Sequence, residues 1–219
     1  MNSINKIIRQ DYKGISYECT NWSIDDFKND DTIPLYATIA YKLNNDLKNG
    51  YYVEIGSNHF KDGSNTYFLE QSHNWNGISV EISKYYSELF NVNRKNKCIN
   101  ENALKINWEK YFEENNFPNI IDFLSIDIDS DAGIHANTLA LLNLPLSRYK
   151  FNIIVIEHSG GSDYVFEHSK EIQRNILSMF GYYLICKGNT DDVWSRTKPD
   201  SINGFGDLNN IIRRVSNEQ

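Results

Sequence analysis

Short apolar runs that end in acidic residues recur along this chain and alternate with segments of helical periodicity. Such runs predict strands that begin at 51 and cover 78–81, 97–100, 120–128, 151–156 and 182–186, with a seventh from 193. Helical spacing falls between them, at 35–47, 85–93, 108–115, 135–144 and 166–180. Strands and helices that alternate in this way form βαβ units. We therefore predict an α/β fold with a doubly wound, mostly parallel, seven-stranded sheet of Rossmann-like type.

Composition limits the kind of protein and its surroundings. A length of 219 residues with 40% hydrophobic side chains is enough for one core, so we expect an N-terminal arm at 1–33, with at most a short helix, and one domain at 34–219. The net charge of −7 argues against a nucleic-acid partner. Three scattered cysteines are typical of reduced thiols in the cytoplasm, and no apolar run is long enough to predict a membrane span.

The turn after the first predicted strand selects among nucleotide ligands. Gly56 permits a tight turn, but Asn58 and Lys61 occupy the positions of the second and third glycines of a dinucleotide fingerprint. A pyrophosphate is therefore disfavoured. S-adenosylmethionine carries no phosphate, and its positive charges favour a nearby carboxylate such as Glu54. A helix should follow, with Ser64 or Asn65 as its N-cap. The alternative is a tight turn that binds no ligand.

Two later strand ends carry further polar groups. Glu81 closes the second predicted strand, where an acid can hold the two ribose hydroxyls of a nucleoside cofactor. Asn102 and Ala103 follow the third strand and are placed to close over an adenine ring. The corresponding alternatives are a solvated acid at a strand end and an ordinary surface loop.

The fourth and fifth predicted strands end in a possible chemical centre. Asp127 and Asp129 point to one face of an extended segment. Together with Glu157 and His158 from the neighbouring strand, they form a set that could hold Mg²⁺ or Mn²⁺ or accept a proton. His158 is the strongest candidate for a general base, because imidazole titrates near neutral pH. The metal is favoured because adjacent carboxylates repel unless a cation or proton lies between them. A buried hydrogen-bond network that orients loops is the alternative.

Several motifs occur in a specific order: VEIG at 53–56, GSNT at 63–66, WNGISVE at 75–81, DFLSIDID at 122–129, IEH at 156–158 and DVW at 192–194. In this order and spacing, from about Tyr51 to Trp194, the chain resembles the FkbM-like branch of class I S-adenosylmethionine-dependent methyltransferases. Two features depart from the family pattern. His59 stands where relatives often have Asp, and Asp191 and Asp192 replace a Glu-Asp pair before Trp194.

The resemblance implies S-adenosylmethionine as cofactor and a division of roles around it. Glu54, Gly56 and Ser57 would contact its methionine part and Glu81 its ribose. Asn102 and Ala103 would lie by the adenine, Asp127 beside the methyl group, and the cofactor-binding set is completed by Asn58 and Asn65.

Family members O-methylate hydroxyls of sugars or natural products and occur beside or fused to glycosyltransferases. A sugar or glycan hydroxyl is therefore the leading expected acceptor, and a glycosyltransferase an expected partner. The two alternatives are a natural-product O-methyltransferase and a non-catalytic cofactor-binding module of a larger complex.

Overall fold

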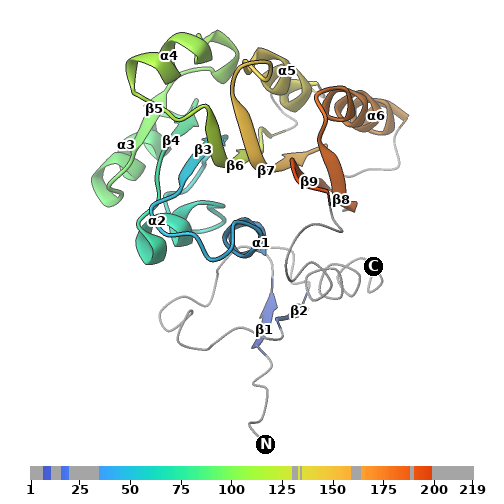
Figure 1. Cartoon of the computed structure of the whole chain (residues 1–219). Helices are drawn as coiled ribbons and strands as arrows, with labels where there is room; N and C mark the ends of the chain where they lie inside the picture. The colour runs from blue at the N-terminus through green and yellow to red at the C-terminus, as the bar shows by residue number, and fades with distance from the viewer. Residues whose placement is uncertain are drawn as a thin grey trace, which may run out of the picture.

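The computed structural model describes residues 7–10, 16–19, 35–129, 133, 135–158, 164–187 and 190–198. Their core is a seven-stranded sheet with strand order β5-β4-β3-β6-β7-β9-β8 (Figure 1). The strands are β3 (Tyr51–Ile55), β4 (Asn76–Glu81), β5 (Lys97–Asn100), β6 (Ile120–Ile126), β7 (Lys150–Glu157), β8 (Tyr183–Lys187) and β9 (Asp191–Ser195). The predicted fold class is confirmed.

Helices pack on both faces of this sheet (Figure 1). One face is covered by α1 (Leu35–Leu43) and α2 (Tyr67–His73), and α3 (Lys84–Asn93) packs beside β4 and β5. The other face is covered by α4 (Trp108–Glu114), α5 (Ala136–Asn143) and α6 (Tyr164–Met179), with the 3₁₀ turn η2 (Ala103–Lys105) beside α5. The central strands are apolar on both sides because both sides are covered. In β6, for example, Leu124 packs into one core cluster and Phe123 into the other.

The strand order reverses between β3 and β6. The chain runs outward through β3, β4 and β5, all parallel, and then returns to form β6 on the other side of β3. In open α/β sheets, ligands bind at the carboxyl ends of the strands at such a reversal. The carboxyl ends of β3 and β6 are therefore the expected position of a ligand-binding site.

The far side of the sheet is closed by an antiparallel strand. β9 lies between β7 and β8 and is antiparallel to both, so that β8 runs in the same direction as the other strands. Val193 and Trp194 of β9 are buried. The strand that was predicted from 193 is confirmed, although its place between β7 and β8 and its direction were not part of the prediction.

The described part of the N-terminal arm is a hairpin. β1 (Ile7–Gln10) pairs antiparallel with β2 (Ser16–Cys19) in a separate two-stranded sheet. The short helix that we expected within 1–33 does not fall in these two strands, and the rest of the arm lies outside the described residues. The same holds for 199–219 of the predicted domain. Among the helices that are described, none combines the length and the apolar character needed to cross a membrane.

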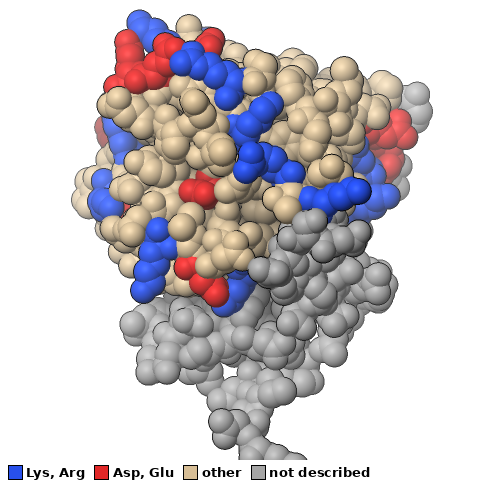
Figure 2. Space-filling model, viewed as in Figure 1, with Lys and Arg blue, Asp and Glu red and all other residues tan. Residues whose placement is uncertain are grey.

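Surface charges of both signs lie close together over α4 (Figure 2). There Arg148 pairs with Glu109 at 3.0 Å and also with Glu113, and about half of the surface of each side chain is exposed. Ion pairs of this kind contribute little to stability because water screens them. They provide a useful contrast with the buried charges described below.

Candidate functional site

The chain turns sharply where β3 ends at the strand-order reversal. Gly56 has a φ of +82°, and a Cβ atom at this position would lie 1.9 Å from the main-chain oxygen of Asp127. The amides of Gly56 and Ser57 both donate to Val80 O, and the Asp127 amide donates to Ile55 O at 2.9 Å. Glycine is therefore required here both by the backbone angle and by the close approach of the end of β6.

Glu54 lies under the loop that follows this turn. Its carboxylate is 2% exposed and accepts hydrogen bonds at 2.7–3.1 Å, whose donors are Ser64 Oγ, the Asn65 amide, Thr66 Oγ1 and Ser79 Oγ. Burial raises the pKa of Glu54, and the charge of Arg94 and these hydrogen bonds oppose that rise. Glu54 thus fixes the loop at 64–66 through hydrogen bonds to its buried carboxylate.

The N-cap of helix α2 lies one residue after Asn65 and two after Ser64, the two predicted N-caps. Thr66 is the N-cap residue and makes no capping hydrogen bond with its own side chain. The Ser64 hydroxyl instead accepts from the amides of Thr66 and Tyr67. The Asn65 side chain donates to Ser125 Oγ at 3.0 Å and links the loop to β6. The residue types of this segment favoured a helix start, and Ser64 does bind the amides at the beginning of α2, while the amide of Asn65 is bound by Glu54.

Arg94 is the buried cation of this region. Its side chain is 0% exposed and forms an ion pair with Glu70 at 2.9 Å. Its other hydrogen bonds reach Phe60 O at 2.9 Å, Thr66 Oγ1 at 3.1 Å and Tyr52 Oη at 3.2 Å. Burial acts to raise the pKa of Glu70, but the charge and hydrogen bonds of Arg94 outweigh it and lower that pKa. One guanidinium therefore ties the loop, through Phe60, to α2 and β3.

Glu81 and Ile82 stand at the end of β4, next to this loop. The Glu81 carboxylate accepts from the amide of Asn58 at 2.8 Å and from the amide of Ser83 at 2.7 Å. Each carboxylate oxygen retains a lone pair for a further donor. Ile82 is 72% exposed, an unusual exposure for a side chain of this size beside a buried acid. Sequence reasoning identified Glu81 and missed Ile82, although the position directly after a strand-end acid was a usable signal.

The predicted adenine residues form part of η2. Asn102 Oδ1 accepts from the Leu104 amide and caps this turn. Ala103 is 6% exposed, and its side chain belongs to the core cluster under α4 and α5. The main chain around 102–104, rather than the Ala103 side chain, is therefore what this segment presents at the end of β5.

Three carboxylates meet at the ends of β6, β7 and the start of β9. Asp127 is exposed on one side and enclosed by protein on the others. This enclosure, together with the negative charges of Glu157 and Asp191, raises its pKa well above the usual value. Burial and the charge of Asp191 also raise the pKa of Glu157. Asp191 accepts a hydrogen bond from Tyr36 Oη of α1 at 3.0 Å. Neither Tyr36 nor Asp191 was among the predicted site residues, although Asp191 stands in the acidic pair before Trp194 that the sequence analysis singled out.

His158 does not join these carboxylates. It is 3% exposed, and its Nε2 lies 3.7 Å from Asp192 Oδ1, which is itself held by Arg174. The reason is the period of a strand: Glu157 and His158 are consecutive, so their side chains point to opposite faces. The imidazole is enclosed beside Asp192, an arrangement that does not favour a direct base, and the catalytic role of His158 stays a prediction.

The predicted metal ligands are likewise not gathered. Among the described residues, no group of three His, Cys, Asp or Glu side chains is placed to hold a metal ion. Asp127 and Glu157 lie together, whereas His158 is turned towards Asp192. Asp127, Asp129, Glu157 and His158 therefore do not form such a group as the described residues are placed, and the metal stays a prediction. A proton shared by Asp127 and Glu157 also relieves the repulsion of the two carboxylates.

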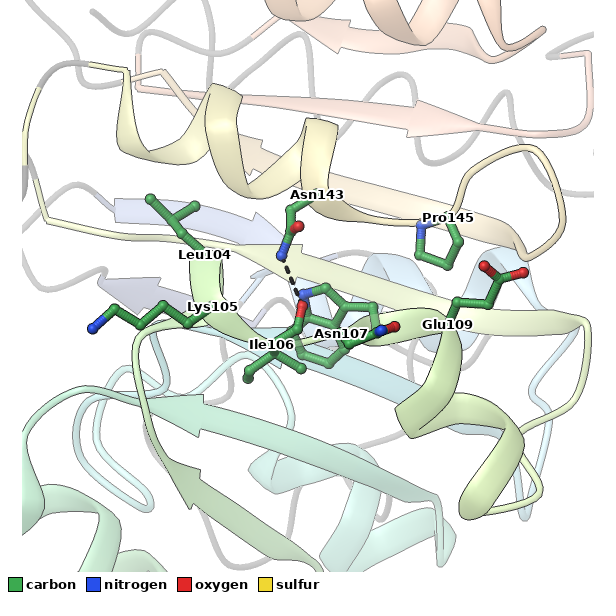
Figure 3. A pocket seen from close by; sticks show the side chains of 8 residues that line it. Leu104, Lys105, Ile106, Asn107, Glu109, Asn143 and Pro145 are labelled. Atoms are coloured by element: carbon green, nitrogen blue, oxygen red, sulfur yellow. Dashed lines mark hydrogen bonds between the residues drawn. The ribbon is translucent and has the colours of Figure 1, made fainter.

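Two surface depressions are found among the described residues, and the first borders the predicted adenine segment through Leu104. One of about 400 Å³ is formed between η2, the start of α4 and the end of α5 (Figure 3). In it Asn143 donates to the main-chain oxygens of Ile106 and Ala103, at 3.0 Å each. The other, of about 330 Å³, includes Asp122 and Asn152 and lies at the opposite ends of β6 and β7. Neither contains the residues of the strand-order reversal, so we place the site by strand topology and side-chain chemistry instead.

Comparison with solved structures identifies similar folds. The methyltransferase domain of METTL16 is 16% identical with a TM-score of 0.52, over 76% of this chain and 69% of that one. An O-methyltransferase from Bacillus cereus in complex with SAH is 15% identical, with a TM-score of 0.47 over 76% and 84% of the two chains. Fibrillarin from Aeropyrum pernix with bound S-adenosyl-L-methionine is 10% identical, with a TM-score of 0.45 over 89% and 83%.

The likeness to METTL16 shows that this chain has the fold of a methyltransferase domain. No protein-family model matches the sequence. No curated protein sequence matches it either.

Proposed function

We propose that this protein is an S-adenosylmethionine-dependent methyltransferase that transfers a methyl group to a hydroxyl, with Glu81 and Ile82 as the core of its cofactor site. The observation that carries the proposal is the pairing of an acid with a 72% exposed isoleucine at the end of β4, beside the reversal of strand order. An acid there can accept from ribose hydroxyls, and an apolar side chain next to it can cover a face of the base.

The surrounding residues fit a nucleoside cofactor without a pyrophosphate. Glu81 retains acceptor capacity after its two main-chain hydrogen bonds. Gly56, Ser57 and Asn58 form a turn that packs against Asp127, and their amides are already bound by Val80 O and by the Glu81 carboxylate, so this turn offers no cradle of free amides to a pyrophosphate. Because the Glu54 carboxylate is occupied by loop residues, we assign its contribution to shaping this loop. The segment 102–104 remains the candidate for the adenine end.

When bound, S-adenosylmethionine supplies an electrophilic methyl group. The protein must then align a hydroxyl oxygen and remove its proton. Asp127 and Glu157 are suited to the second task, because a carboxyl with a raised pKa is a stronger base than an ordinary one. The negative charge at this edge also attracts a sulfonium cation.

A sugar or glycan hydroxyl is the acceptor that we propose, as a member of the FkbM-like branch would use. The motifs from Val53 to Trp194 support this finer assignment, and a cooperating glycosyltransferase is the partner that goes with it. A small natural-product alcohol is the second candidate, since it demands the same chemistry at Asp127. Incubation with labelled cofactor and a panel of nucleotide-linked sugars, lipid-linked sugars and small alcohols separates the two. Tight cofactor binding without transfer to any of them would point to a non-catalytic module.

Cofactor binding should depend on Glu81. We expect Glu81→Ala to weaken S-adenosylmethionine binding by about 1.5–3 kcal/mol, the usual value of hydrogen bonds to a charged acceptor, which is roughly a 10- to 150-fold rise in Kd. Titration calorimetry measures this change. Glu88→Ala, in an exposed acid on the next helix, is the matched control and should bind as the wild type does. Equal affinity of the two variants, or tighter binding of NAD than of S-adenosylmethionine, would rule out the proposed site.

Methyl transfer should not need a divalent metal. Because the described carboxylates and His158 do not form a metal cage, we expect the rate to be unchanged by EDTA. We also expect the rate to rise with pH as the carboxyl pair loses its proton, through an ionisation above the usual aspartate pKa of about 3.9. Loss of activity in EDTA that Mg²⁺ or Mn²⁺ restores would contradict this expectation and support a metal-dependent methyl transfer.

A further inference from the structure

A buried amide joins the ends of β6 and β7. Asn137, the second residue of α5, is 4% exposed. Its Oδ1 accepts from the amide of Ile128 at 2.7 Å, and its Nδ2 donates to Ile128 O at 3.1 Å and to Glu157 Oε2 at 3.4 Å. Both ends of one side-chain amide thus bind the main chain of a single residue, and the amine end also reaches a carboxylate on the next strand.

We call these hydrogen bonds of the Asn137 side chain to Ile128 and Glu157 the Asn137 clamp. The clamp lies at the position where β6 no longer pairs with another strand. The Asp127 amide still donates to Ile55 O of β3, but β6 ends at Ile126 and no strand pairs with Ile128. Asn137 satisfies both main-chain groups of Ile128 in place of a strand. Asp127 is therefore fixed on both sides, by β3 before it and by Asn137 after it.

Glu157 is held from two helices. Its main-chain oxygen accepts from Gln173 Nε2 of α6 at 3.3 Å, and its side chain accepts from Asn137. Gln173 also donates to Thr138 Oγ1, next to Asn137 in the sequence. These polar groups are 4% exposed or less and make a buried network directly behind the carboxyl pair.

We propose that Asn137 is a positioning residue for methyl transfer. It fixes the position of the Asp127 carboxylate relative to that of Glu157 and does not itself contact the substrate. This rests on the function proposed above. The role requires an amide, since it uses one acceptor and one donor. An aspartate of the same shape could accept from Ile128 but could not donate to Ile128 O or to Glu157.

The chain contains a control with the same hydrogen bonds at an exposed position. Asn91 of α3 binds the main chain of Cys98 in the same way, with Nδ2 donating to Cys98 O at 2.8 Å and Oδ1 accepting from the Cys98 amide at 2.9 Å. It lies at the β5 edge of the sheet, and it makes no contact with the carboxyl pair in any hydrogen bond described. Substitution at Asn91 therefore reports what the loss of such a clamp does to folding alone.

The test compares Asn137→Asp with Asn91→Asp, using the acceptor that gives the highest rate in the panel above. We expect Asn137→Asp to lower kcat by about 10²-fold, the usual cost of misplacing a reacting group by about 1 Å, while the calorimetric Kd of S-adenosylhomocysteine stays within about twofold. Asn91→Asp should lower the melting temperature less, because Asn91 is exposed and Asn137 is buried, and it should leave kcat near the wild-type value. A wild-type kcat in Asn137→Asp overturns the positioning role.

A second measurement does not depend on activity. Amide hydrogen exchange at Ile128 should accelerate in Asn137→Ala and remain slow in Asn91→Ala. Unchanged exchange at Ile128 overturns the clamp itself. If exchange accelerates as expected but the wild-type protein methylates no acceptor in the panel, the clamp stands and the proposed function fails, and the positioning role fails with it.

Discussion

Arg94→Met should destabilise the protein by about 3–5 kcal/mol, the usual cost of removing one partner from a buried ion pair. The substitution leaves the carboxylate of Glu70 without its cation, although burial opposes its charge, and it withdraws a counter-charge from Glu54. It also frees Phe60 O, so the loop loses its anchor as well. For a chain of this length the melting temperature should fall by roughly 10 °C or more. Calorimetric or circular-dichroism melts measure both quantities.

The penalty should depend on pH in a defined direction. The pKa of Glu70 is lowered in the folded protein, so the stability that Arg94 provides is present above the unfolded pKa of about 4.3 and is lost as the pH falls through the folded value. The difference between wild type and Arg94→Met should therefore narrow in acid. Arg148→Met is the control, because Arg148 also pairs with two glutamates but on the surface, and its melting temperature should not change measurably. Equal effects of the two substitutions would contradict the buried-charge explanation.

Gly56→Ala should be comparably severe and should also abolish cofactor binding. The backbone angle costs about 1–2 kcal/mol for any residue with a Cβ atom, and the clash with Asp127 O at 1.9 Å can be relieved only if the ends of β3 and β6 separate. We expect a total destabilisation of about 3 kcal/mol or more. Urea unfolding measures the stability, and calorimetry with S-adenosylhomocysteine measures the binding.

Gly63→Ala distinguishes the two causes of that loss. Gly63 lies in the same loop with a φ of +75°, but a Cβ atom there meets nothing within 4 Å. It should lose about 1 kcal/mol from backbone strain alone and retain cofactor binding. If Gly56→Ala proved no more harmful than Gly63→Ala, the close approach of β3 to β6 would not be what fixes the site.

The fold was predictable because its signals are local and repeated. The run 120–128 is apolar on both faces, which a buried parallel strand requires, and Glu81 marks the end of β4 with an acid. The position of β9 was not predictable in the same way. Its two neighbours are set by long-range pairing, and nothing within 191–195 records which strands lie beside it.

The site was predicted in part, and the failures have physical causes. Glu157 and His158 were grouped because they are adjacent in the sequence, but adjacency in a strand places them on opposite faces. Glu54 was assigned to the ligand because it ends a strand, but its partners Ser64 and Thr66 come from a loop whose path the sequence does not reveal. The contact of Tyr36 with Asp191 spans 155 residues, which no local pattern can encode.

The antiparallel strand β9 also determines when this sheet can be completed. β7 exposes an unpaired edge until β9 reaches it, yet β9 lies after α6 and β8 in the chain. On a ribosome that adds roughly 5–20 residues per second, the 33 residues between them (158–190) take some seconds to emerge. During that interval the apolar edge of β7, from Ile153 to Ile156, has no strand on that side. The last strand of the described chain, β9, therefore joins β8 to the rest of the sheet and covers an edge that could otherwise pair with another nascent chain.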